Sequence, residues 1–148
     1  MTDLVTFLSA RLDIDEQVAR EALAGEWRNA STSSHYEDVA GPSEAVFTAL
    51  PDTGLTVVAR TGARGDRAAM VNAEHIARHD PARVLAEVDA KRRIIAEHRG
   101  SGVTCPRCSL GAEDGQVVYW RDPCATLRLL ALPYADHPEY RPEWAPEA

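Results

Sequence analysis

The chain has 148 residues, of which 45% are hydrophobic and 26% are charged, and its formal net charge is −7. This composition excludes wholesale disorder and is sufficient for one domain, residues 1–148, with a hydrophobic core. No apolar run approaches the roughly 18–20 residues that span a bilayer, and the first residues lack the basic start and cleavage site of a secretory signal. We therefore expect a cytoplasmic protein with no membrane association.

The negative charge is unevenly distributed along the chain. Residues 1–44 carry three basic and nine acidic side chains. Residues 45–104 carry nine basic and seven acidic side chains, and residues 105–148 carry four basic and seven acidic ones. Non-specific nucleic-acid binding needs several cations on one face to neutralise phosphates. An acidic chain with a mildly basic middle is therefore a poor candidate for a nucleic-acid-binding protein.

The first predicted element is a helix over residues 3–25, with apolar residues at spacings of three, four and five. Asp13 followed by Glu16 is typical of a capping box, which predicts a break or kink near Leu12–Asp13. Residues 29–44 are predicted to form a loop. Residues 45–60 contain two β-prone segments around a Pro-Asp-Thr-Gly turn, which predicts an antiparallel hairpin.

After a second loop at residues 61–67, two helices are predicted within residues 69–98. The second of them begins with Asp80 as N-cap and Pro81 in the first turn and runs to about His98. Its apolar face is predicted to comprise Val84, Leu85, Val88, Ile94, Ile95 and His98. Lys91 interrupts this face, and we expect its stem to pack on the core while its ammonium group reaches solvent.

The C-terminal part is predicted to hold a zinc knuckle and a helix within residues 103–132. A Cys-x-x-Cys turn is followed by an acidic loop, a short strand over residues 116–120 and a helix that opens at Asp122-Pro123 and ends before Pro133. Residues 133–148 are rich in proline and aromatic residues. Because Tyr and Trp usually bury their rings, we expect this tail to be docked rather than free.

The three cysteines carry the most specific chemistry in the chain. Cys105 and Cys108 are separated by two residues, so that one tight turn can direct both sulfurs at a single Zn²⁺. Cys124, predicted in the first turn of a helix, would supply a third thiolate in the order of a treble-clef-like site. The alternative is that the cysteines are small core residues without a metal.

Three thiolates leave a tetrahedral site one ligand short, and a histidine is expected to complete it. His98 is the first candidate, because it ends the long helix seven residues before Cys105. His137 is the second candidate, the pair His75 and His79 is the third, and His35 is the least favoured because it lies in the polar loop. A complete Cys₃His set predicts a structural zinc ion.

Catalytic motifs were compared with the sequence, and none is complete. Glu74 precedes His75 and His79, but the order differs from that of metalloprotease helices, and the His-x-Glu of zinc deaminases is missing upstream of Cys105. A Cys-x-x-Cys pair also occurs in thioredoxin-like redox sites, but there it starts a helix, whereas the sequence that follows Cys108 is turn-like. A small hydrolase or thiol redox enzyme is therefore only the second alternative for the function.

Four segments of the chain resemble an uncharacterised family of small proteins from high-GC Gram-positive bacteria and their phages. They are residues 3–20, 80–88, 91–95 and 124–144, of which the last contains the specific Leu-Pro-Tyr-Ala-Asp-His-Pro sequence. The resemblance implies a self-contained domain and adds no chemistry. A role associated with phages or mobile elements would fit it.

Together these observations predict a mainly helical α+β domain with a small hairpin and a zinc-knuckle or treble-clef-like C-terminal element. We expect a zinc-stabilised binding or regulatory protein that has a protein partner and can form a homodimer. The main alternative is a zinc-supported nucleic-acid-binding protein that uses the cluster Lys91–Arg93 together with Arg107.

Overall fold

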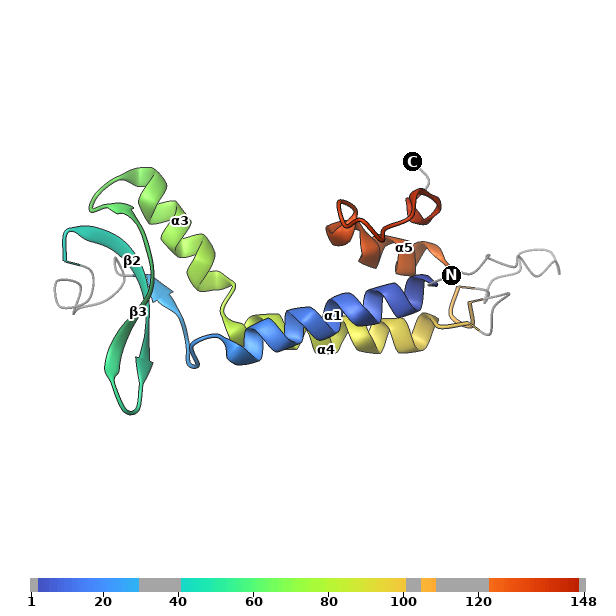
Figure 1. Cartoon of the computed structure of the whole chain (residues 1–148), viewed down its shortest axis with the longest axis horizontal. Coiled ribbons are helices and arrows are strands. Elements are labelled where there is room, and N and C mark those ends of the chain that lie inside the picture. Colours follow the sequence, from blue (N-terminus) through green and yellow to red (C-terminus); the bar gives the residue numbers. More distant parts are fainter. Residues whose placement is uncertain (1–2, 30–40, 101–104, 109–122, 147–148) are drawn as a thin grey trace. The chain divides into compact units, whose positions relative to one another are not determined.

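The computed structural model describes residues 3–29, 41–100, 105–108 and 123–146. The chain divides into two compact units, one of Asp15–Glu87 and one of Met1–Ile14 with Val88–Ala148. The predicted fold class is confirmed: within the described ranges, α-helices accompany one small antiparallel sheet (Figure 1). The helices are α1 (Leu4–Glu21), α3 (Arg67–Arg78), α4 (Pro81–His98) and α5 (Ala125–Ala131).

The sheet belongs to the first of these units and has the strand order β1-β2-β3. The predicted hairpin is confirmed by β2 (Ser43–Leu50) and β3 (Gly54–Ala63), which pair antiparallel around a turn at residues 51–53. β3 continues to Ala63, so the predicted loop at residues 61–67 was too long. β1 (Arg28–Asn29) pairs with β2 and was not predicted, because two residues carry too little pattern to identify a strand.

Helix α3 contacts all three strands (Figure 1). It begins at the N-cap Asp66, whose carboxylate accepts a hydrogen bond of 2.9 Å from the backbone N–H of Ala69. Ala69 and Ala73, one turn apart, are buried. Gly62 of β3 has φ +149°, and a Cβ at this position would lie 2.9 Å from the Cβ of Ala69. Small residues on both elements therefore allow the close approach of helix and sheet.

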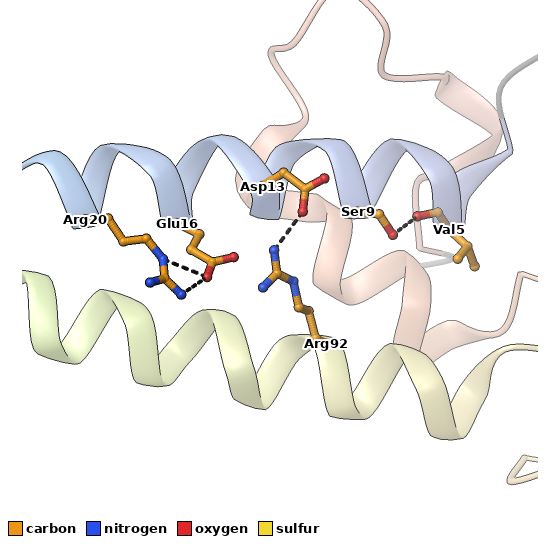
Figure 2. Close-up of polar contacts among 6 residues, drawn as sticks. All are labelled: Val5, Ser9, Asp13, Glu16, Arg20 and Arg92. Atoms are coloured by element: carbon orange, nitrogen blue, oxygen red, sulfur yellow. Dashed lines mark hydrogen bonds and ion pairs between the residues drawn. The ribbon is translucent and has the colours of Figure 1, made fainter.

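Helix α1 is continuous, so the predicted break near Leu12–Asp13 was wrong. The two residues of the supposed capping box form other hydrogen bonds (Figure 2). The Asp13 carboxylate accepts a hydrogen bond of 2.7 Å from Arg92 of α4, and the Glu16 carboxylate accepts one of 2.9 Å from Arg20 in the next turn. The helix is capped instead by Asp3, whose carboxylate accepts a hydrogen bond of 2.8 Å from the backbone N–H of Thr6. An ion pair with another helix and a pair within α1 thus use the two side chains that the sequence assigned to a cap.

Helix α4 begins at Pro81 and ends at His98, as predicted. The Asp80 carboxylate accepts 2.9 Å from the backbone N–H of Arg83 and so caps the first turn. Val88 and Ile95, two turns apart, are buried, whereas Ile94 is exposed although the sequence placed it on the apolar face. The helix therefore buries a narrower stripe than its sequence predicts.

The C-terminal tail is docked within its own unit, as expected from its aromatic residues. Phe7 of α1 is 2% exposed and lies at the centre of a group of rings. The centroid distances from Phe7 are 6.3 Å to Tyr134, 5.6 Å to His137, 6.2 Å to Tyr140 and 5.1 Å to Trp144. Two 3₁₀ turns, Leu132–Tyr134 and Pro142–Trp144, shape this segment.

Arg11 extends the aromatic group with a cation. Its guanidinium lies 5.6 Å from the Phe7 ring centroid, donates a hydrogen bond to Nε2 of His137, and lies 3.7 Å from the Glu139 carboxylate. A planar guanidinium can stack on a ring and bond a carboxylate at once.

Among the described helices, none is both long and apolar enough to cross a membrane.

Candidate metal centre

His98 is positioned by the end of α4. The helix runs through the buried residues Val88 and Ile95, and His98 follows Ile95 by three positions, so that it lies close to the buried face. Its side chain is half-buried and its Nδ1 atom is turned toward the cysteines. The helix that the sequence predicted most strongly therefore delivers one potential ligand.

Cys105 and Cys108 lie at the two ends of a tight turn. The backbone N–H groups of Cys108 and Arg107 favour the ionised form of the Cys105 sulfur and lower its pKa. Arg107 also forms an ion pair of 3.3 Å with Glu97, which ties the turn to the last turn of α4. The turn is thus built to present a sulfur that carries negative charge, since N–H donors favour the thiolate.

Cys124 is the N-cap residue of α5, and its carbonyl accepts 3.1 Å from the backbone N–H of Arg128. The sequence had placed Cys124 in the first turn of a helix that opens at Asp122-Pro123, so that boundary was two residues too early. Cys124 therefore lies at the edge of α5 and not within its first turn. Leu127, fully buried, anchors the helix and so fixes the position of the third sulfur.

The four predicted side chains converge on one point. Nδ1 of His98 lies 3.4 Å from the sulfur of Cys105, 3.5 Å from that of Cys108 and 3.6 Å from that of Cys124. All four potential ligand atoms lie within 4.8 Å of one another. For zinc at about 2.3 Å from sulfur and 2.1 Å from nitrogen, tetrahedral geometry requires N···S separations of about 3.6 Å. The three N···S separations therefore agree with those around a tetrahedral zinc ion, which would also bring the sulfurs to about 3.8 Å from one another.

Burial and electrostatics distinguish the three cysteines. Cys105 and Cys124 are 0% and 2% exposed, whereas Cys108 is half-buried. Burial, helped by the two neighbouring thiols, raises the pKa of Cys108 to about 11. Burial also opposes ionisation of Cys105, but the N–H groups of Cys108 and Arg107 and the adjacent thiols outweigh it, so the pKa of Cys105 is lowered. A divalent cation bound at this point would favour the thiolate form of the cysteines, because it supplies positive charge beside the sulfurs.

The other histidines take different roles. His137 packs on Phe7 and bonds Arg11, and His75 and His79 lie on α3 in the other unit. His35, the acidic loop after Cys108 and the predicted strand at residues 116–120 lie outside the described residues. Sequence reasoning missed the contact between Arg107 and Glu97. Its only signal was a cation inside the Cys-x-x-Cys turn and an acid near the end of α4.

The sequence matches the profile of a family of unknown function, DUF6221, over residues 1–146. The chain belongs to this family. The match confirms that the chain belongs to an uncharacterised family and extends over nearly the whole chain. No curated protein and no solved structure shows significant similarity to the chain. The family carries no activity that can be transferred, so function has to be argued from the His/Cys group itself.

Proposed function

We propose that His98, Cys105, Cys108 and Cys124 bind one zinc ion that holds their unit together. The observation that supports this most directly is the nearly equal distance, 3.4–3.6 Å, from one histidine nitrogen to three cysteine sulfurs. Chance packing of thiols in a core has no reason to place them symmetrically around an imidazole nitrogen. Soft thiolates with one imidazole favour zinc over magnesium or calcium, which prefer oxygen.

The proposed role of the zinc ion is structural. A catalytic zinc keeps a coordination position open for water or substrate, whereas four protein ligands occupy the whole tetrahedron. The ligands join three separate segments: the end of α4, the turn at residues 105–108 and the start of α5. A metal bound by the native state alone adds its binding free energy to folding, so this cross-link would stabilise the unit.

A protein partner is proposed in preference to a nucleic acid. The cations of the predicted basic cluster are engaged by carboxylates: Arg92 with Asp13 at 2.7 Å and Arg93 with Asp89 at 2.8 Å. Arg107, the cation outside the cluster, pairs with Glu97, so three of the four cations of that alternative are engaged by carboxylates. Phosphates would have to compete with these carboxylates. Leu129 and Leu132, by contrast, are 55% and 45% exposed just after the ligand Cys124, and apolar surface of this kind favours a protein contact.

The zinc proposal is tested by metal analysis of protein purified without added metal. Wild-type chain should hold one zinc per molecule, and His98→Ala should lower its zinc affinity. His75→Ala, which removes a histidine of the other unit, is the matched control and should leave the cysteine centre loaded. Equal zinc retention in both variants would show that His98 is not a ligand.

The partner proposal is tested by affinity purification and cross-linking mass spectrometry with the zinc-loaded full chain. The matched variant is Leu129→Ser/Leu132→Ser, which removes exposed apolar surface and should keep the fold. A protein captured by the wild type and lost in this variant supports the proposal. Capture of nucleic acid instead, lost on nuclease treatment, would contradict it.

A further inference from the structure

His75 and His79 form a pair on one face of α3. They are four residues apart, so their side chains lie one helical turn from each other, and both are exposed. Their ring centroids are 4.5 Å apart and the ring planes are inclined by 48°. Two imidazoles at this spacing can bind one metal ion together, as paired histidines on helices do in metal sites.

The tautomer of His79 is set for metal binding. Its Nδ1 lies 2.8 Å from the backbone carbonyl oxygen of His75. Because a carbonyl can only accept, Nδ1 must carry the proton, and the lone pair is left on Nε2. Histidines that bind metals usually donate their other ring N–H in this way, which orients the ring.

The distance between the rings indicates the geometry that the pair can offer. For a metal about 2.1 Å from a nitrogen of each ring, the ring centres lie about 4.6 Å apart at a right angle and about 5.3 Å apart at the tetrahedral angle. The observed 4.5 Å agrees with the right angle. Neighbouring positions at a right angle suit nickel(II) or copper(II), with water in the remaining positions.

Acidic residues flank the pair in the sequence, and one more lines a cavity with His79. Glu74 precedes His75 and is balanced by Arg78 at 2.5 Å, Asp80 follows His79, and Asp15 lines the same cavity of ≈ 230 Å³ as His79. The net charge of these four side chains is negative, which favours a cation at the histidines. We infer that His75 and His79 form a second, exchangeable site for one divalent transition-metal ion of the nickel or copper class, separate from the cysteine centre.

The inference is tested with nickel on full-length protein whose cysteine centre already holds zinc. Isothermal titration with NiCl₂ should show one bound nickel per chain, while the zinc content stays unchanged. His75→Gln and His79→Gln should each abolish the nickel isotherm. Nickel that enters only as zinc leaves would place it at the cysteines and overturn the inference, as would unchanged binding in His79→Gln.

A matched variant separates chelation from histidine content. Asn72→His/His75→Gln keeps the number of histidines but places two of them seven residues apart, about 10 Å along the helix axis, which is too far to share one ion. This variant should bind nickel no better than His75→Gln. In wild-type protein, copper(II) should broaden amide signals around residues 75–80. Broadening elsewhere, or nickel binding that survives in the spaced variant, would contradict the inference. The two sites share no residue, so loss of nickel binding in His79→Gln supports the inference whether or not the cysteines hold zinc.

Discussion

Removing the Phe7 ring tests how the tail is held. Phe7 is 2% exposed and is in contact with four rings of the C-terminal segment. Phe→Ala substitutions in cores cost about 3–5 kcal/mol, and individual aromatic pairs contribute about 0.5–1.5 kcal/mol within such totals. Because several pairs are lost together, we expect Phe7→Ala to lower the free energy of unfolding by about 4 kcal/mol. With a urea m-value of about 2 kcal/mol/M, the midpoint would fall by about 2 M.

A local measurement distinguishes loss of tail docking from general destabilisation. The tail is closed by short backbone hydrogen bonds, such as those from the N–H of His137 to Tyr134 and from the N–H of Trp144 to Arg141. In Phe7→Ala these amides should exchange with deuterium much faster under native conditions. Phe47→Ala, a buried phenylalanine of the other unit, is the matched control and should leave their exchange unchanged. Slow exchange in Phe7→Ala would refute the docking by Phe7.

Three further outcomes are expected. In metal-free protein the pKa of the Cys108 thiol is raised to about 11, so the stability that its protonated form contributes is present below about pH 9 and is lost as the pH rises through 11. Melting curves against pH should therefore fall more steeply over this range in metal-free wild type than in zinc-loaded protein or in Cys108→Ser. Gly62→Ala should destabilise by more than Gly54→Ala, because only the first would place a Cβ 2.9 Å from Ala69, and urea titrations would contradict this if the two midpoints agreed. Mobility-shift assays over a salt series should show no DNA or RNA complex at about 150 mM salt; a complex that persists there and tightens at lower salt would favour the nucleic-acid alternative.

Elements with a strong local signal could be predicted from the sequence. Asp80 and Pro81 start α4 where the sequence places them, since an N-cap followed by proline in the first turn is a local signal for a helix start. The hairpin around residues 51–53 also has a local signal, a Pro-Asp-Thr-Gly turn, and its Gly54 adopts a positive φ of +69° that favours glycine. The start of α5 was misplaced because Asp122-Pro123 has the same local pattern without being its N-cap.

Elements that depend on partners distant in sequence could not be predicted. Asp13 looked like a cap, but its partner is Arg92, 79 residues away. The Cys-x-x-Cys turn was recognisable, and His98 could be chosen only by its place at the end of α4. The N–H groups that point at the Cys105 sulfur, and the link from Arg107 to Glu97, have no sequence pattern of their own. They arise from the folded backbone, so they appear only with the structure.

The central claim is that one imidazole and three thiolates hold a zinc ion, and X-ray absorption at the zinc edge tests it most directly. Protein purified without added metal should contain zinc with three sulfur neighbours at about 2.3 Å and one nitrogen at about 2.1 Å. His98→Ala should lose the nitrogen neighbour of this set, while the sulfur shell remains. Protein that contains no zinc, or zinc surrounded by oxygen and nitrogen alone, would contradict the claim.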